Sequence, residues 1–423
     1  MNNIKAYKKF IYVLILLLAA SCTQNKIKST DAKKSADDKT VSAAKINSTA
    51  EKKSADDSDE ILIHRFDTGE NRNGTNNKKE PATITAVGDV ILNLATMRMI
   101  LDNRLKKYGQ HNTVSYSFSK VRNEMSGIGF CNLEAPITDL SVKSFNDKDE
   151  IFYFNSPGGS ERILNSGGFN VVSLANNHIM DTGKAGMLDT YKRLKELNII
   201  PVGVGNNINE ALKPVYINDK GTVVAIFAFS TVIPKSVWAG PGKAGAAGGS
   251  NELLLAAVKK VSRKADAVFV SIHWGQETET DFPVKEPERE QVELAHKLID
   301  AGASCIVGHH SHAVGFVERY KNGVIFYSLG DFVFAGRHSA AHTTSIMAQV
   351  SLSSAGLESY TIIPVNINPL EIEYSPEILD ENRGIEVLDR ILINYNDSKY
   401  IDYYERIRKT ILEIEKSIPP IKD

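Results

Sequence analysis

The sequence predicts an α/β domain in which helices cover a sheet, preceded by a polar, disordered N-terminal tether. Two observations carry this prediction. From residue 83 onward, short apolar runs rich in β-branched residues alternate with longer amphipathic segments. The short runs are apolar at nearly every position, which indicates strands buried on both faces.

The predicted elements follow one another along the chain. Strand-like runs occupy residues 83–87, 128–131, 170–174, 222–229, 267–272, 304–307 and 324–328, with two more at 345–352 and 359–365. Helical spacing of apolar residues marks 187–197, 252–262, 288–301 and a polar tail at 386–418. The chain thus divides into a signal peptide (1–22), a low-complexity tether (23–80), a main domain (81–370) and a helical C-terminal extension (371–423).

The N-terminus predicts a lipoprotein signal. Three lysines precede an apolar stretch at 11–20 that is too short for a membrane span. Small residues at 19–21 then lead into Cys22, which we expect to carry a lipid and to anchor the protein to a membrane of the bacterial cell envelope. Ala19 stands where such signals usually have Leu, and an uncleaved anchor or a plain cleaved signal is the alternative.

Residues 23–80 are rich in Lys, Asp, Ser, Ala and Asn and hold few large apolar side chains. Such a composition cannot bury enough surface to offset the entropy of ordering, so we expect a solvated tether. The short apolar group at 61–63 is a candidate docking point, but a plain linker is the preferred interpretation.

Charge and cysteine content exclude some partners and chemistries. Lys and Arg number 50 against 51 Asp and Glu, which leaves no basic surplus for binding nucleic acid. Cys131 and Cys305 lie inside apolar runs, so we interpret them as small core residues. A thiolate metal site or a cysteine nucleophile is the alternative.

Polar clusters follow six of the predicted strands, where ligands gather in layered α/β folds. The clusters are Gly88-Asp89, Asn132-Leu133-Glu134, Asn176-Asn177-His178, His273-Trp274-Gly275-Gln276-Glu277, His309-His310-Ser311-His312 and Gly330-Asp331. Carboxylate, amide and imidazole ligands without thiolate suit Mn, Fe or Zn. The number of clusters favours two divalent ions, which together clamp the attacking and leaving oxygens of a hydrolysis.

Each cluster alone also has an ordinary structural interpretation. Asp89 fits a turn, Glu134 a loop, Asn176 a cap and His273 a buried core imidazole. His310 and His312 are more specific, because histidines flanking one residue at a strand end can face the same site. The six clusters taken together favour the metal site.

These clusters, with neighbours such as Ala135-Pro136 and Tyr327-Ser328-Leu329, resemble in order and spacing the CapA-type capsule and poly-γ-glutamate synthesis proteins over residues 83–335. That family is similar to the calcineurin-like metallophosphatases. The resemblance implies a four-layer α/β/β/α sandwich of the metallophosphatase type.

The resemblance also implies roles for individual residues. The implied metal ligands are Asp89, Glu134, Asn177, His273, His310 and His312, with Glu134 as the bridging carboxylate. His178 corresponds to the catalytic histidine that donates a proton or steadies a phosphoryl oxygen. Asp181 would orient His178, and Glu277 would orient His273. His309 falls at a variable place in the motif and is given no role.

Three positions depart from the expected motifs. Ile91 stands where the phosphatase signature has a histidine two residues after the first aspartate. Ser311 replaces the proline that the family commonly has between the paired histidines. Asp331 replaces a common asparagine, adds a negative charge beside the site, and is a candidate extra ligand; a strand-end turn is the alternative.

The resemblance implies an envelope protein that acts in making, exporting or trimming capsule or a poly-γ-glutamate-like anionic polymer. We expect a metal-dependent hydrolase directed at a phosphoester or a γ-glutamyl amide, working beside polymer-synthesis membrane proteins. The competing hypothesis is a non-catalytic lipoprotein scaffold in a polymer-export assembly.

Overall fold

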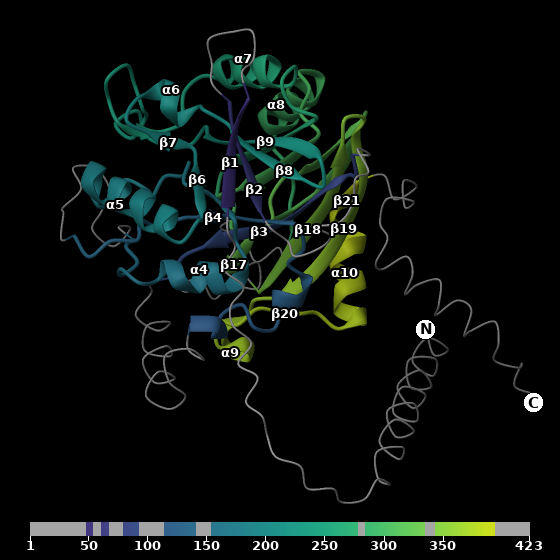
Figure 1. Cartoon of the computed structure of the whole chain (residues 1–423). Helices are drawn as coiled ribbons and strands as arrows, with labels where there is room; N and C mark the ends of the chain where they lie inside the picture. The colour runs from purple at the N-terminus through teal and green to yellow at the C-terminus, as the bar shows by residue number, and fades with distance from the viewer. Residues whose placement is uncertain are drawn as a thin grey trace, which may run out of the picture. The chain divides into compact units, whose positions relative to one another are not determined.

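Two sheets packed face to face form the centre of the protein, and helices cover their outer faces (Figure 1). The structure, a computed structural model, describes residues 48–53, 61–66, 79–92, 114–140, 154–277, 284–334 and 343–393. The four-layer α/β/β/α architecture expected from the sequence is confirmed.

The first sheet has nine strands in the order β1-β2-β8-β9-β11-β13-β16-β15-β21. Their bounds in that order are Ser48–Lys53, Ile61–Phe66, Val215–Asp219, Thr222–Ser230, Ala267–His273, Cys305–His309, Gly323–Phe326, Val317–Tyr320 and Leu392–Ile393. Strands β9, β11, β13 and β16 are parallel, so their carboxyl ends meet at one edge.

The second sheet has the strand order β20-β19-β18-β3-β4-β5-β6, and β17 also pairs with β3. The bounds, with β17 last, are Glu377–Ile378, Gly356–Asn366, Thr344–Ser353, Ala82–Val90, Ile128–Leu133, Val171–Ser173, Ile200–Val202 and Asp331–Val333. Strands β3 to β6 are parallel. Short ladders join β7 (Val204–Gly205) to β10 (Gly245–Ala246) and β12 (Val284–Lys285) to β14 (Val314–Gly315).

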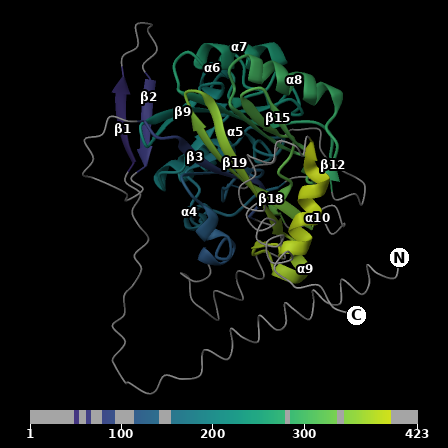
Figure 2. The ribbon, with the colours of Figure 1, turned by 90° about the vertical axis from the view of Figure 1, so that its right-hand side faces the viewer.

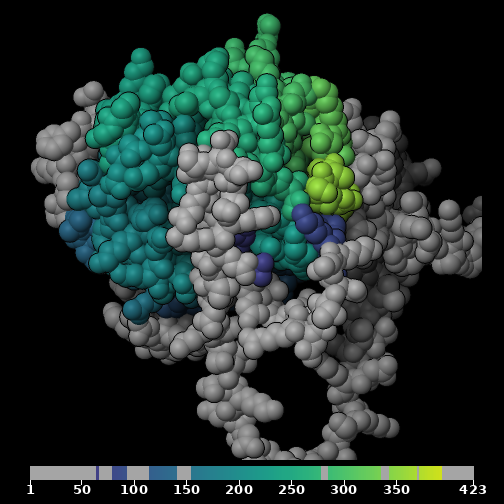
Figure 3. Space-filling view, turned by 45° about the horizontal axis from the view of Figure 1, so that its top comes forward, coloured from purple at the N-terminus to yellow at the C-terminus, as the bar shows by residue number. Residues whose placement is uncertain are grey.

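Helices α7 (Asn251–Val261) and α8 (Arg289–Asp300) cover the first sheet, and Figure 3 shows their side of the protein in teal and green. Leu254 and Val258 of α7 join the apolar cluster that also fills the space between the sheets. In α8, Leu294 and Leu298 repeat at a spacing of four residues and face the same cluster.

The second sheet carries α4 (Glu161–Gly167) and α5 (Gly183–Glu196) on its outer face, where Leu164, Met187 and Leu194 pack in a separate apolar cluster. The shorter helical segments are η1 (Arg122–Glu124), α6 (Ile208–Ala211) and α9 (Pro369–Ile372). Helix α10 (Glu381–Ile391) lies beside β19 (Figure 2).

Most of the predicted elements appear with small shifts of their ends. The paired runs at 345–352 and 359–365 form the long hairpin of β18 and β19. Cys131 and Cys305 are buried and unpaired in the core, as expected, and burial raises the pKa of both thiols.

The predicted tether differs from the structure in its second half. β1 and β2 lie within residues 23–80, and Ile63 to Arg65 of β2 pair in parallel with β8. The physical reason is the apolar group at 61–63, because Ile63 packs against the central core. Cys22 and the predicted signal peptide lie outside the described residues. Among the described helices, none is long and apolar enough to cross a membrane.

The predicted C-terminal extension contributes to the main domain through residue 393. β20 extends the second sheet, β21 extends the first, and Leu388 and Ile391 of α10 join the central core. The part of the predicted helical tail beyond residue 393 lies outside the described residues.

Removing β2 should weaken the fold slightly without affecting the site. We expect deletion of residues 23–78 to lower the free energy of unfolding by about 1 kcal/mol, since Ile63 is only half-buried and a fully buried Ile contributes roughly 1.5–3 kcal/mol. Deletion of residues 23–44 is the matched control and should leave stability unchanged. Chemical denaturation measures both, and equal stability of the two truncated proteins would contradict a packing role for β2.

Candidate metal centre

The carboxyl ends of strands from both sheets bring a buried cluster of carboxylates and imidazoles together. Three overlapping groups each have ligand atoms within 4.8 Å of one another: Glu134 with His310 and His312, Asp89 with His312 and Asp331, and Asp89 with Glu134 and His273. The cluster therefore joins five of the six predicted ligands across the two sheets, from β3 and the end of β4 to β11 and the loop after β13.

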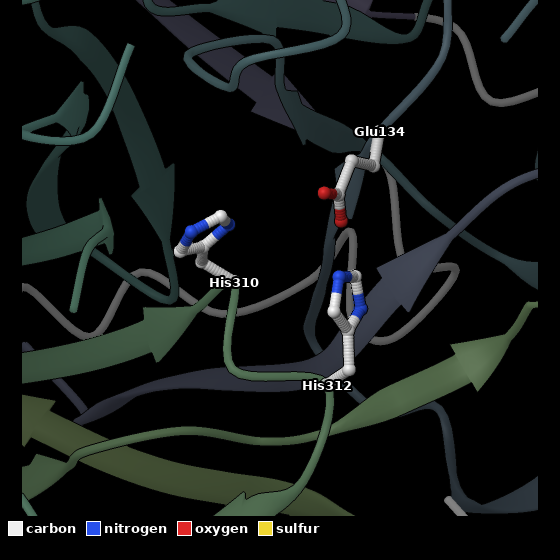
Figure 4. A group of neighbouring side chains, drawn as sticks. All are labelled: Glu134, His310 and His312. Carbon is white, nitrogen blue, oxygen red and sulfur yellow. The ribbon is translucent and has the colours of Figure 1, made fainter. Parts of the chain in front are cut away.

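Glu134 lies at the centre of this cluster. Its side chain is fully buried, and neither carboxylate oxygen has a hydrogen-bond partner among the described residues. Its carboxylate points into the space between the rings of His310 and His312 (Figure 4), and Oε1 lies 3.5 Å from Nε2 of His273. Burial raises the pKa of Glu134 well above its ordinary value, and the nearby negative charges of Asp89 and Asp331 raise it further.

The loop after β13 presents the paired histidines in an uncommon backbone conformation. His310 and His312 have φ angles of 91° and 60°, a region that non-glycine residues seldom adopt. The amide N–H of His310 donates to Oδ2 of Asp89 at 3.1 Å, which ties the loop to β3. Ser311 holds the loop from the other side, because its hydroxyl donates to the carbonyl of Ala313 and lies 2.9 Å from the Ser328 hydroxyl.

His273 and Asn177 direct their ligand atoms to one point. Nε2 of His273 lies 2.8 Å from Oδ1 of Asn177, and Nδ1 lies 3.4 Å from the amide nitrogen of Asn132. Burial, then the neighbouring His310, lowers the pKa of His273 well below its ordinary value. Burial, then His312, lowers the pKa of His310 to about 4. Both rings are therefore neutral near pH 7, which is the form that binds a metal.

His178 and Asp181 form a buried pair beside the cluster. Nδ1 of His178 lies 2.7 Å from Oδ2 of Asp181, and the same oxygen accepts the backbone N–H of Phe154 at 2.9 Å. The contact expected between these two residues is present. It fixes the orientation of the imidazole ring and assigns the Nδ1 proton to the carboxylate side.

Three residues that were given no role in the expected metal site hold its predicted ligands in place. Nδ1 of His309 lies 2.8 Å from Oδ1 of Asp89, and both side chains are fully buried. Asn132 donates to the same oxygen at 2.9 Å, and Asn176 in turn donates to Oδ1 of Asn132 at 3.1 Å. Their only signal in the sequence was adjacency to predicted ligands within the same motifs.

Asp89 is held ionised by these neighbours. Burial alone would raise the pKa of its carboxyl, but the charge and contact of His309, with His273 and His312, lower that pKa below its ordinary value. A buried carboxylate in its ionised form is a ready metal ligand.

Glu277 and Asp331, both expected beside the ligands, lie in different surroundings. Glu277 is exposed on the loop after β11, and the ring nitrogens of His273 face Asn177 and Asn132. The orienting contact expected between Glu277 and His273 stays a prediction. Asp331 lies inside the cluster, with Oδ1 2.7 Å from Nδ1 of His312.

The donor set fits a divalent cation. Glu134 has buried oxygens without donors, and Nδ1 of His310 likewise has no hydrogen-bond partner among the described residues. Leaving such groups buried without a partner is costly, and a cation between them would offset that cost. The ligands are oxygens and neutral imidazoles, a combination that suits Mn, Fe or Zn.

Fold and site together define a class: a four-layer α/β/β/α protein with a buried carboxylate–imidazole cluster between its two sheets. The model of the bacterial capsule synthesis protein family PGA_cap matches residues 83–336, a span that contains every member of this cluster. The chain belongs to this family.

Two curated relatives extend the match. The chain is 30% identical over 312 residues to the capsule biosynthesis protein CapA of Bacillus anthracis, covering 72% of each chain. It is 32% identical over 238 residues to the PGA biosynthesis protein CapA of Bacillus subtilis, covering 56% of this chain and 60% of that protein. Among solved structures, a phosphatase from Mycoplasma pneumoniae is similar at 12% identity and a TM-score of 0.40, covering 68% of this chain and 95% of that one.

The low pKa of His310 predicts a pH-dependent stability for the metal-free protein. The folded protein keeps His310 neutral down to about pH 4, whereas an unfolded chain takes up the proton near the ordinary value of 6.5. The unfolded state therefore binds more protons between these values, and stability falls as the pH falls, by about 2 kcal/mol for this residue at pH 5.

Chemical denaturation of chelator-treated protein at pH 7 and pH 5 measures this loss. His310→Gln is the comparison variant and should lose about 2 kcal/mol less than the unmodified protein over the same interval. Equal losses in the two proteins would show that His310 is not the group that titrates.

Proposed function

We propose that this protein is a metal-dependent hydrolase of the bacterial envelope that acts in the synthesis, export or trimming of capsule or a poly-γ-glutamate-like polymer. The observation that carries the proposal is the buried Glu134 carboxylate, which lies among three imidazoles and has no hydrogen-bond partner among the residues that the structure describes. The names of the CapA relatives support the choice of polymer.

The site would hold two divalent ions, Mn, Fe or Zn, bridged by Glu134. Asn177, His273 and His310 would complete one position, and Asp89 and His312 would contribute to the other. Bound there, the ions would polarise a phosphoester or γ-glutamyl amide and lower the pKa of water.

The protein's own residues supply the remaining steps. Asp181 accepts the Nδ1–H of His178, so proton transfer to the leaving group falls to Nε2 of that ring. Asn132 and His309 hold Asp89 in one orientation, and the amide of His310 fixes the loop of the paired histidines to the same carboxylate. These contacts prepare the geometry before a substrate arrives, which is how such sites avoid reorganisation during reaction.

A non-catalytic scaffold of a polymer-export assembly is the second candidate. The observation that favours it is Ile91, a buried side chain without a donor atom at the place where the phosphatase signature has a histidine. A scaffold would keep the fold and some metal binding without turnover.

Ligand and proton-donor variants distinguish the two functions. We expect His310→Ala and His312→Ala to lose metal, because each removes an imidazole that faces Glu134. His178→Ala should keep its metal and lose turnover by roughly 10²–10⁴-fold, since it removes a proton donor.

The measurements are elemental analysis and hydrolysis of bis-p-nitrophenyl phosphate and of poly-γ-glutamate. Lys192→Gln, a change at an exposed position of α5 outside the site, is a control that should retain both metal and turnover. Full metal content in both His310→Ala and His312→Ala would overturn the site, whereas a metal-loaded protein inactive on both substrates would support the scaffold.

We also propose that Cys22 carries the lipid that attaches the protein to the envelope membrane. The basis is the order of charged, apolar and small residues before Cys22. Cys22→Ala should move the protein from the membrane fraction to the soluble fraction, provided the signal is still cleaved. A cleaved variant that stays with membranes after a high-salt wash would place the anchor elsewhere.

A further inference from the structure

Strand β17 brings Asp331 directly beside Asp89. The two strands run parallel, with Asp331 paired to Asp89, and the amide of Asp89 donates to the carbonyl of Gly330 at 2.9 Å. This approach requires glycine at position 88, because a Cβ there would lie 1.9 Å from that carbonyl oxygen. The fold therefore places a second carboxylate next to the first.

Asp331 has the burial and the neighbours of a ligand. It is 2% exposed, and it shares with Asp89 and His312 a group whose ligand atoms lie within 4.8 Å of one another. Its charge also acts on Glu134, whose pKa it helps to raise. A carboxylate buried among other carboxylates is unfavourable unless a positive charge lies between them.

Ile91 shows which ligand is missing. It lies two residues after Asp89, directly beyond β3, where its amide donates to the carbonyl of Val333 at 2.8 Å. Ile91 is fully buried, yet it belongs to neither of the two apolar clusters of the described core. β3 thus supplies one ligand atom at this point of the site, from Asp89, and its neighbour β17 supplies another, from Asp331.

We propose that Asp331 is a ligand of the divalent cation held by Asp89, Glu134 and His312, in place of the imidazole absent at Ile91. This inference rests on the proposed two-metal site and assigns the residue that completes its first position. Three carboxylates and one imidazole make this position richer in oxygen than the position of Asn177, His273 and His310. It should therefore favour Mn²⁺ over Zn²⁺, whereas the second position should suit the two ions equally well.

The alternative role for Asp331 is to orient His312, since its Oδ1 lies 2.7 Å from Nδ1 of that ring. Asp331→Asn separates the two roles, because an amide oxygen can still accept the Nδ1–H but brings no negative charge to a cation. Asp331→Ala removes both functions. Ile91→His in the Asp331→Ala background places a metal-binding imidazole directly after β3. It does not restore the partner of His312.

The experiment measures the Mn²⁺ content of the purified full chain after equilibrium dialysis, and Mn²⁺ affinity by calorimetry. We expect two ions in the unmodified protein, one in Asp331→Ala, and two again in Ile91→His/Asp331→Ala. Asp331→Asn should bind the second ion at least 10-fold more weakly. Thermal melting of each variant, with Ile91→His alone as the matched control, separates loss of metal from loss of fold.

The outcomes separate a failure of the Asp331 assignment from a failure of the proposed function. Two ions in a folded Asp331→Ala variant would overturn the ligand role and leave the two-metal site standing. Unchanged affinity in Asp331→Asn would likewise overturn it in favour of the orienting role. Absence of any bound ion in the unmodified protein would instead overturn the proposed function, and the ligand assignment with it.

Discussion

The structure depends on one unfavourable feature, a carboxyl group buried between two sheets that has no hydrogen-bond partner in the part of the chain that the structure describes. Moving an ionised carboxylate out of water costs several kcal/mol unless a positive charge or donors compensate it. Glu134 has three imidazoles and two further carboxylates around it, and its pKa is raised accordingly. A cation would supply the missing charge, so the energetics of the site favour metal binding.

The candidate site also depends on the close approach of the backbone segments around it. The candidate site's side chains on β3 and β11 and on the loops after β4 and β13 converge only if the two sheets and the strand-end loops come close together. Glycines permit this contact: a Cβ at position 308 would lie 2.0 Å from the carbonyl oxygen of Tyr327, just as one at position 88 would meet Gly330. The glycines beside Asp89 and His309 are thus part of the site, although they carry no ligand.

Much of the fold and of the candidate site could be predicted from the sequence, because strands and the polar clusters at their ends follow local rules. Apolar runs marked β3, β4, β11 and β13, and polar clusters followed these runs directly, so their convergence at strand ends was a consequence of parallel sheets. What was missed depends on long-range geometry. His309 contacts Asp89 across 220 positions of sequence, and β2 joins β8 through one half-buried isoleucine that composition alone assigned to a linker.

The loop of the paired histidines shows how the protein fixes the positions of these side chains. Positive φ angles at His310 and His312 cost of order 1–3 kcal/mol each, and such strain persists only where the surroundings determine the conformation. Here the amide of His310 is bound by Asp89, which is itself fixed by Asn132, while the serine between the histidines is held by Ser328. The serine hydroxyl therefore supplies through hydrogen bonds the rigidity that a proline would supply covalently. Contacts among the site's own polar groups therefore hold the loop of the paired histidines in place.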